Sequence, residues 1–223
     1  MDTDLNRDAP SERSLAVRVA TQMRDLLIAG DFAPGEKLSE HQIATRFDIS
    51  RNTLREVFRL VTSEGLLEHV PNRGVFVVSP DEAAILDIYR VRRVIQGGAV
   101  QASAPGHPAL AQMRGCVARA QAAREQGDWQ LVGTENMAFH GAMVGLCDST
   151  RLSAYFARLL AELRLVFRQM EDSAFLHEPY IRLNAELVAL LEAGDIAAAS
   201  TALDAYLLKS ERSILGAFLR DRG

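Results

Sequence analysis

Apolar residues at spacings of three and four mark the first regular pattern along the chain. They are Leu15, Val19, Met23, Leu26 and Leu27. This spacing places them on one face of a helix. We expect Gly30 to end that helix, because glycine readily takes the left-handed conformation that follows a last helical turn. Residues 32–35, which include a Pro-Gly pair, then predict a turn.

Capping signals predict two further helices. Ser39 is followed three residues later by Gln42, which fits a capping box, so a short helix is expected between there and Asp48. Asp48 begins a tight link, where it tolerates a positive φ better than most residues do. Ser50 has the side chain of an N-cap, and a third helix is expected over residues 50–64.

Branched apolar residues then replace the helical pattern. Residues 66–70 and 75–78 are expected to be short strands, joined by a Pro-Asn-Arg-Gly turn at residues 71–74. The order of helix, short helix, tight link, helix and hairpin is that of a winged helix-turn-helix. We therefore predict such a domain over residues 14–79.

Helical spacing continues without strand signals from Pro80 onward. Proline disfavours helix in the residue before it, so the domain boundary is expected between Ser79 and Pro80. Six helices are predicted, at residues 81–104, 108–126, 129–147, 150–172, 177–193 and 195–220. The fold class is therefore mainly α, with an N-terminal winged helix-turn-helix followed by an all-α antiparallel helical bundle over residues 80–223.

Composition fits a two-domain chain of 223 residues, of which 48% are hydrophobic. No run of about 18 apolar residues indicates a membrane span. Residues 1–13 lack the apolar stretch of a signal peptide, and we expect a disordered leader there. Cys116 and Cys147 each stand alone among apolar residues, which favours reduced, buried thiols in the cytoplasm; a disulfide between them is the alternative.

The formal net charge of −4 argues weakly against nucleic-acid binding, but the placement of the positive charges argues for it. Between Ser50 and Arg59, Arg51, Arg55 and Arg59 stand against a single acid, Glu56. The first turn of that helix enters the major groove in this motif, and Arg51 and Arg55 share a helix face. One can read base edges while the other grips phosphate; the alternative is a solvated face that binds nothing. The opposite face is expected to point inward and consists of Leu54, Val57, Phe58 and Val61.

Three segments resemble the GntR family of bacterial regulators, namely residues 32–40 (FAPGEKLSE), 49–56 (ISRNTLRE) and 64–67 (EGLL). The helical remainder resembles the FadR-type subfamily and its FCD effector-binding domain. Together the resemblance covers nearly all of residues 14–221. It implies that operator DNA is contacted by the helix-turn-helix and by the tip of the wing. The implied contact residues are His41, Ser50, Arg51, Asn52, Thr53, Arg55, Asn72, Arg73 and Gly74.

Many members of this subfamily hold a divalent metal in the helical bundle. The ligands are an aspartate, a histidine four residues later and two histidines on the last two helices. Here His140 matches the first histidine, whereas Asn136 replaces the aspartate, and Asn184 and Tyr206 align with the other two histidines. Because this set offers no anionic ligand, we expect no metal and no other cofactor.

The same four side chains offer amide, imidazole and hydroxyl groups, which suit a metal-free pocket for a carboxylate or a hydroxyl-bearing ligand. Arg92 resembles an arginine that is common in the family and is expected to pair with a ligand carboxylate, while Gln96 stands where the family often has glutamate. Each of these residues has core packing as its alternative role. Arg164 and Arg168 are expected on the surface, with the cavity as their alternative.

These observations predict a homodimeric regulator in the cytoplasm, a repressor that a small organic acid releases from its operator, with activation as the alternative. The expected partners are double-stranded DNA, a carboxylate effector and a second copy of the chain, with no membrane. No phosphate loop or catalytic motif is recognised, so no catalytic residue is assigned and no enzyme is predicted. The alternatives are a helical protein-interaction module and an enzyme that acts on a small acid.

Overall fold

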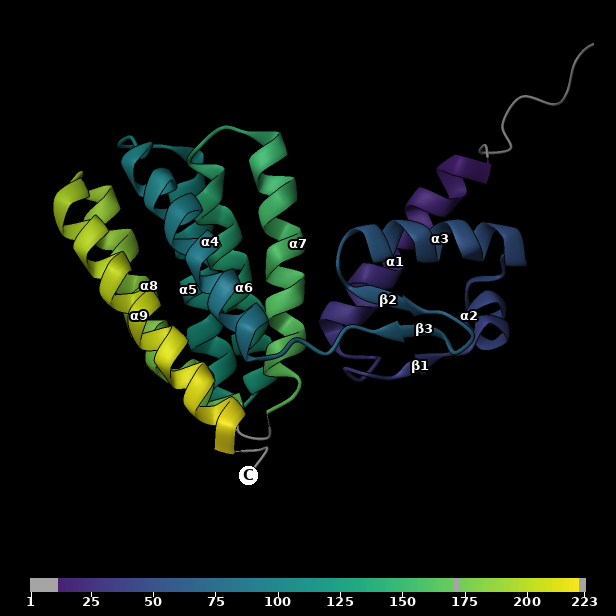
Figure 1. Ribbon diagram of the computed structural model, residues 1–223. Helices are drawn as coiled ribbons and strands as arrows, with labels where there is room; N and C mark the ends of the chain where they lie inside the picture. The colour runs from purple at the N-terminus through teal and green to yellow at the C-terminus, as the bar shows by residue number, and fades with distance from the viewer. Residues whose placement is uncertain (1–11, 171–172, 221–223) are drawn as a thin grey trace, which may run out of the picture. The chain divides into compact units, whose positions relative to one another are not determined.

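The computed structural model describes residues 12–170 and 173–220, in two compact units that divide between Ser79 and Pro80 (Figure 1). The leader expected at residues 1–13 lies outside the described residues as far as residue 11. A helix already begins at Glu12, so the regular structure starts slightly before the expected end of that leader.

The described part of the N-terminal unit combines helices with a three-stranded sheet. In chain order its elements are α1 (Glu12–Ala29), β1 (Lys37–Leu38), α2 (Glu40–Phe47), α3 (Arg51–Ser63), β2 (Leu67–Val70) and β3 (Gly74–Val77). The strands are antiparallel in the order β1-β3-β2, so β3 lies in the middle of the sheet. This arrangement confirms the predicted winged helix-turn-helix.

The strand β1 was not predicted. Lys37 of β1 pairs with Phe76 of β3, but two residues are too few to produce a visible alternation of polar and apolar side chains. The turn before β1 contains Gly35 at a φ of 78°, and its N–H donates to the carbonyl of Val77 at 3.0 Å. The turn is thus attached to β3 by a contact between segments far apart in the sequence.

An apolar core and one ion pair join α1 to α3. Met23 and Leu27 of α1 are fully buried, as is Leu54 of α3. Arg24 donates to both carboxylate oxygens of Glu64, at 2.7 and 2.6 Å, and the Glu64 side chain is only 9% exposed. Because Glu64 is the C-cap residue of α3, this bidentate pair fixes the end of α3 against α1.

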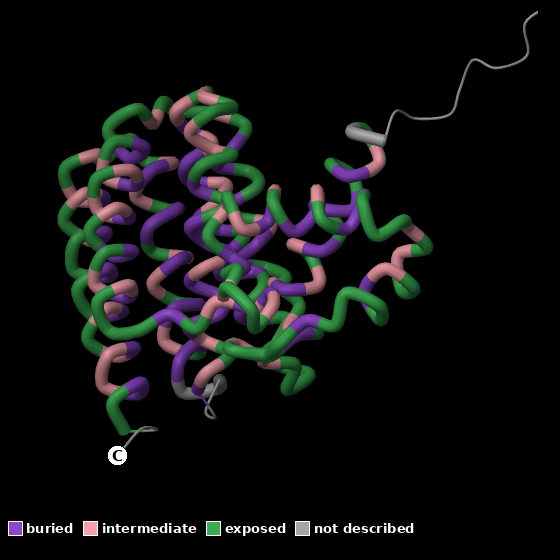
Figure 2. The backbone as a smooth tube through the Cα atoms, turned by 45° about the vertical axis from the view of Figure 1, so that its right-hand side comes forward, coloured by how far each residue is buried: buried purple, intermediate pink, exposed green. Residues whose placement is uncertain are grey.

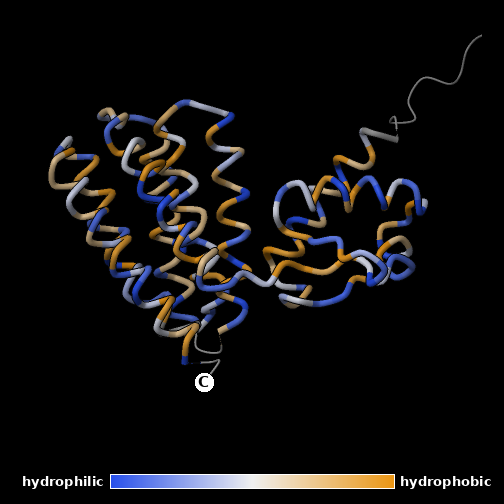
Figure 3. The backbone as a smooth tube through the Cα atoms, in the orientation of Figure 1, coloured by the Kyte–Doolittle hydropathy of each residue, from blue (hydrophilic) through white to orange (hydrophobic). Residues whose placement is uncertain are grey.

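The described part of the C-terminal unit is a helical bundle, as predicted. Its helices are α4 (Glu82–Gln101), α5 (Pro108–Glu125), α6 (Trp129–Gly145), α7 (Thr150–Phe167), α8 (Ser173–Glu192) and α9 (Ile196–Arg220). Their apolar faces meet in one main core, which appears as buried turns in Figure 2 and as hydrophobic turns in Figure 3.

The largest differences from the expected helix boundaries are at the end of α7 and the start of α8. α7 ends at Phe167 rather than at residue 172, and α8 begins at Ser173 rather than at residue 177. Pro179 therefore lies inside α8, where it was expected to lie near the start. Leu176 and His177, in the turn before the proline, are each 3% exposed. Burial of that turn offsets the hydrogen bond that proline cannot make.

The two cysteines are free thiols, so the alternative of a disulfide is excluded. Cys116 is buried as expected, whereas Cys147 is only half-buried.

Among the helices of residues 12–170 and 173–220, none has the length and apolar character needed to cross a membrane.

Candidate DNA-binding surface and ligand-binding core

The helix-turn-helix is built by two capped helices and one left-handed residue. The Ser39 hydroxyl accepts from the N–H of Gln42 at 3.4 Å and caps α2. Asp48 has a φ of 49°, which confirms the expected positive φ, and the N–H of Ile49 returns to the carbonyl of Ala44 at 3.0 Å. This tight link fixes the direction in which α3 leaves α2.

The first turn of α3 divides its polar residues between capping and exposure. Ser50 accepts from the N–H of Thr53 at 3.1 Å, and the two hydroxyls lie 2.9 Å apart. Thr53 is consequently buried, at 6% exposure, whereas Arg51, Asn52 and Arg55 are exposed. The inward face is confirmed by the buried residues Leu54, Val57, Phe58 and Val61.

The arginines of α3 are not equivalent. Arg59 donates to both oxygens of Glu56, at 2.9 and 2.6 Å, and this bond raises the pKa of the exposed Arg59 guanidinium. Arg51 and Arg55 take part in no ion pair with any described residue. Their charge is therefore available to a polyanion, while that of Arg59 is largely neutralised by Glu56.

The wing is a tight hairpin with a cationic tip. Asn72 and Gly74 have φ values of 60° and 111°, and the guanidinium of Arg73 lies over the Phe76 ring at 5.4 Å from its centroid. Lys37, which the sequence analysis did not single out, also reaches this tip. A Cβ on Gly74 would lie 3.3 Å from the Lys37 Cε. His41, the remaining predicted contact, is exposed on α2.

The four side chains aligned with the metal ligands of the family meet in the interior of the bundle. Asn136 and His140 come from α6, Asn184 from α8 and Tyr206 from α9, and all are buried. His140 Nε2 lies 2.8 Å from the Tyr206 hydroxyl, which donates to Asn136 Oδ1 at 3.1 Å. Asn184 Nδ2 donates to the same Asn136 oxygen at 2.7 Å.

Hydrogen-bond geometry assigns the proton on the His140 ring. Gln96 Nε2, which can only donate, lies 2.7 Å from Nδ1, so Nδ1 accepts and Nε2–H donates to Tyr206. Burial and the nearby Arg92 guanidinium hold the pKa of His140 well below its usual value, which keeps the ring neutral. Burial also raises the pKa of Tyr206 well above its usual value, so the hydroxyl keeps its proton. We call this chain of side chains the core network: Gln96, Asn136, His140, Asn184 and Tyr206.

Arg92 adjoins the core network as a buried cation. Its side chain is 2% exposed, its Nε donates to Gln96 Oε1 at 3.1 Å, and its guanidinium lies over the Tyr89 ring at 4.8 Å from the centroid. No ion pair joins Arg92 to a carboxylate of the described residues. Two polar atoms on α8, the Tyr180 hydroxyl and Asn184 Oδ1, are also buried without a hydrogen-bond partner among those residues.

The core network does not fit a divalent metal. Both ring nitrogens of His140 are engaged, and the other members present amides and a phenol in place of the carboxylate and imidazole ligands that such metals prefer. In the part of the chain that the structure describes, no three His, Cys, Asp or Glu side chains are grouped so that they could hold a metal ion.

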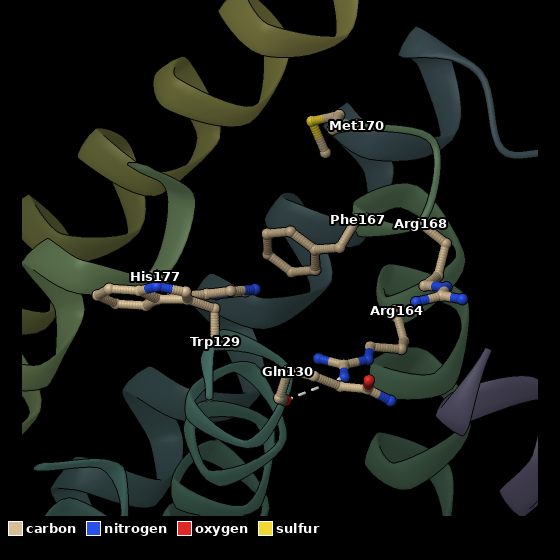
Figure 4. A pocket seen from close by; sticks show the side chains of 7 residues that line it. All are labelled: Trp129, Gln130, Arg164, Phe167, Arg168, Met170 and His177. Carbon is tan, nitrogen blue, oxygen red and sulfur yellow. Dashed lines mark hydrogen bonds between the residues drawn. The ribbon is translucent and has the colours of Figure 1, made fainter. Parts of the chain in front are cut away.

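A cavity lies between α6, α7 and α8 of the same bundle (Figure 4). Arg164, expected on the surface, is 4% exposed and lines this cavity, whereas Arg168 is exposed as expected. Trp129 and His177 also line it, although no sequence pattern predicted a role for either. Helical periodicity could not identify them, because it does not reveal which helices pack together.

Comparison with known families decides the identity of both units. The model described as bacterial regulatory proteins, gntR family, matches residues 10–77, and the FCD domain model matches residues 87–209. The chain belongs to the GntR family, in the group with an FCD domain. It is a DNA-binding transcriptional regulator that responds to a ligand.

This GntR protein resembles curated regulators along its length. It is 27% identical over 207 residues to the probable D-xylose utilization operon transcriptional repressor of Paenarthrobacter nicotinovorans, covering 88% of each chain. Over 86 residues it is 34% identical to the gluconate operon transcriptional repressor of Bacillus subtilis, covering 39% of this chain and 35% of that one.

Solved structures show the same two-unit fold. A GntR protein from Rhodococcus sp. RHA1 is 38% identical, with a TM-score of 0.85 over 91% of this chain and 98% of that one. McbR/YncC of E. coli has a TM-score of 0.79 with the same coverage and 21% identity. The exposed arginines of α3 thus lie in the GntR part of the chain, and the core network lies in the FCD part.

Proposed function

We propose that this GntR protein is a homodimeric repressor that a small carboxylate releases from its operator without the help of a metal. The observation that carries the proposal is the pairing of two features. Arg51 and Arg55 are exposed on the DNA-facing helix and Arg92 is buried in the ligand-binding unit, and none of the three forms an ion pair with another residue that the structure describes.

The DNA-binding part of the proposal assigns base reading to the first turn of α3. Arg51 and Asn52 are exposed there, and both side chains can donate to base edges in the major groove. Arg55, one turn later, is placed to contact phosphate, and Arg73 of the wing is placed to enter the minor groove. Ser50 and Thr53 act mainly by capping α3, since their hydroxyls bond to each other.

A homodimer is supported by the logic of the operator. The paired recognition helices of a dimer match the two half-sites of a palindromic operator, so contacts at both half-sites add to the affinity for DNA. Large apolar side chains on the helical unit are also exposed, among them Val94 at 77% and Tyr155 at 52%. Sedimentation of the purified protein tests this part, and a monomer at the concentration that binds DNA would contradict it.

The effector part of the proposal follows from the energetics of burial. A buried guanidinium without an anion is costly, and a ligand carboxylate would offset that cost through charge-assisted hydrogen bonds. The Tyr180 hydroxyl and Asn184 Oδ1 have no hydrogen-bond partner among the described residues, so a ligand that also carries a hydroxyl group would satisfy further polar atoms. Such binding would favour one placement of the DNA-binding units, with a coupling free energy of about 1–3 kcal/mol. The mechanism involves no catalytic step and operates in the cytoplasm.

The test begins with DNA. The purified full chain is used to select duplexes from a random library, and binding to the selected duplex is measured by fluorescence anisotropy at several salt concentrations. We expect one palindromic sequence and an affinity that falls linearly with salt on logarithmic axes, because bound counterions are released. Failure to enrich any duplex would contradict DNA binding and favour a protein-docking module.

The second test addresses the effector. A thermal-shift screen of small carboxylates in the presence of a chelator should find a ligand that stabilises the protein and weakens its binding to the selected duplex. Arg92→Gln should lose this response, whereas Arg90→Gln, an exposed arginine on the same helix, should keep it. A response that requires added metal would contradict the metal-free mechanism.

A further inference from the structure

A cavity of about 190 Å³ lies between α6, α7 and α8, and none of its lining residues belongs to the core network. In Figure 4, Arg164, Phe167 and Arg168 lie on one side of the opening, with Trp129 and His177 on the other. The volume is below the roughly 300–1,000 Å³ of pockets that take drug-sized ligands. The cavity therefore suits a small metabolite.

Arg164 gives the cavity a cation that is held in place. One guanidinium nitrogen, Nη2, donates to the Gln130 carbonyl at 3.3 Å and to the Thr134 hydroxyl at 3.2 Å. These bonds orient the planar group, which is almost fully buried. Burial and the neighbouring Arg168 lower the pKa of Arg164, as expected where two cations approach each other in a poorly solvated place.

Gly133 makes room for the polar side of the cavity. A Cβ at this position would lie 2.6 Å from Arg164 Nη1 and 2.7 Å from His177 Nε2, closer than real Cβ contacts allow. Any other residue here would displace one or both side chains. Glycine in the middle of a helix also costs about 1 kcal/mol relative to alanine. At Gly133 this loss of helix stability is accompanied by the close packing of Arg164 and His177 against the helix backbone.

His177 contributes a buried polar atom without a partner. Its side chain is 3% exposed, and its Nδ1 makes no hydrogen bond with any described residue. Burial, together with the charge of Arg164, lowers the pKa of His177 to about 4, so the ring is neutral near pH 7. A neutral imidazole ring has one N–H donor and one nitrogen acceptor. It can therefore donate to a carboxylate oxygen or accept from a hydroxyl group.

The remaining walls are flat and apolar. The Phe167 and His177 rings lie 4.8 Å apart between centroids, and Trp129 and Met170 also line the cavity. Flat rings and a thioether pack well against a planar hydrocarbon group but offer nothing to inorganic phosphate. The cavity thus combines an oriented guanidinium with a surface for a flat apolar body.

We propose that this cavity is a second ligand site, separate from the core network, and that it binds a small carboxylate with a flat apolar body, such as an aromatic acid. The carboxylate contacts Arg164 inside and Arg168 at the opening, a hydrogen bond forms with His177, and the flat body packs against Trp129 and Phe167. A guanidinium suits a carboxylate because the hydrogen bonds between them are charge-assisted.

Trp129 is the only tryptophan in the chain, so its fluorescence reports on this cavity directly. The experiment titrates the full-length protein with benzoate and follows emission on excitation of tryptophan. Benzamide, which has the same shape without the charge, is the matched ligand control. We expect saturable emission changes with benzoate and a much weaker response to benzamide. No saturable change with benzoate in the millimolar range, or equal binding of the two compounds, would overturn the proposal.

Variants separate this site from the proposed effector core. Arg168→Gln alters an exposed side chain and should weaken benzoate binding by roughly tenfold or more, as loss of a charged hydrogen bond does. Arg158→Gln, which alters an exposed arginine on α7, should leave it unchanged. Arg92→Gln should also leave it unchanged, because Arg92 belongs to the other site. Equal weakening by Arg168→Gln and Arg158→Gln would overturn the cavity assignment, and loss of the signal in Arg92→Gln would mean that the two sites are one.

Discussion

His140 Nε2 lies 2.8 Å from the Tyr206 hydroxyl, although the two residues are separated by 66 positions in the chain. This bond lies where many relatives are expected to hold a metal, and it links α6 to α9 directly. The hydroxyl in turn donates a hydrogen bond to Asn136 Oδ1, so the bond is one step in a chain of hydrogen bonds that runs from Gln96 to Asn136. A hydrogen-bonded network thus connects four helices of the bundle, α4, α6, α8 and α9.

Removal of the Tyr206 hydroxyl should destabilise the helical unit. Tyr206→Phe leaves the His140 N–H without an acceptor and removes one donor from Asn136, so we expect the free energy of unfolding to fall by about 1–3 kcal/mol. Urea denaturation measures the change. Tyr155→Phe, which alters a side chain that is 52% exposed, is the control and should have almost no effect. Equal stability of the two variants would mean that the bond does not form in solution.

Chelation should leave the protein unchanged. We expect no stoichiometric divalent metal in the purified protein and no shift of its Tm in the presence of a chelator, because the core network provides no anionic ligand. The triple variant Asn136→Asp, Asn184→His, Tyr206→His restores the ligand set of the relatives and should gain stability when zinc is added. Metal that is retained by the unmodified protein through purification would contradict this prediction.

The two kinds of arginine on α3 should differ in their effect on DNA binding. Arg51→Ala should weaken binding to the selected duplex by about 1–3 kcal/mol, as loss of a base-reading arginine does. Arg59→Ala should cost clearly less, because Glu56 already neutralises that charge. Fluorescence anisotropy at one fixed salt concentration measures both. The assignment of Arg51 fails if the losses are equal.

His177 should make the protein less stable in acid. Its folded pKa of about 4 lies below the unfolded value of 6.5, so the unfolded chain takes up the proton first. The stabilisation from the neutral ring is complete above pH 6.5 and is lost as the pH falls from there toward 4, by roughly 3 kcal/mol at most. Urea denaturation at several pH values, compared with His177→Gln, isolates this contribution. Parallel pH profiles would contradict the low pKa.

Gly133 should tolerate no side chain. Gly133→Ala should lower the free energy of unfolding by about 1–3 kcal/mol, because the added Cβ displaces Arg164 and His177. Gly98→Ala on α4 is the matched control, since a Cβ there meets nothing within 4 Å. That control should stabilise the protein slightly, by up to about 1 kcal/mol, through helix propensity. Thermal unfolding shows whether each variant raises or lowers the stability of the protein. A stabilising Gly133→Ala would contradict the close approach of Arg164 and His177 to Gly133.

Local signals were sufficient for much of the fold. Ser39, Asp48 and Ser50 act within a few residues of their own positions, and the structure confirms the two caps and the positive φ that they predict. The inward face of α3 was equally readable, because one face of a helix repeats with a fixed period. Such features depend on backbone geometry that neighbouring residues determine.

Other features depended on contacts between distant segments. The strand β1 exists because Lys37 meets Phe76, and α8 continues past Pro179 because the preceding turn is buried. Periodicity showed that Arg164 lies on a helix but not that α6 and α8 cover its face. The residues of the core network also depend on contacts between distant segments. The sequence supplied the identities of Asn136, His140, Asn184 and Tyr206, and the resemblance to a family suggested that they meet.

The sequence by itself determined most of the helices, the caps at Ser39 and Ser50 and the order of the two units. Only the tertiary structure decided which polar groups satisfy one another, which remain without partners and where a cavity is left. The physical reason is the distance along the sequence over which each interaction acts. Capping and periodicity act over a few residues, whereas the burial of a charge and the pairing of a donor depend on side chains that folding brings together from distant parts of the chain.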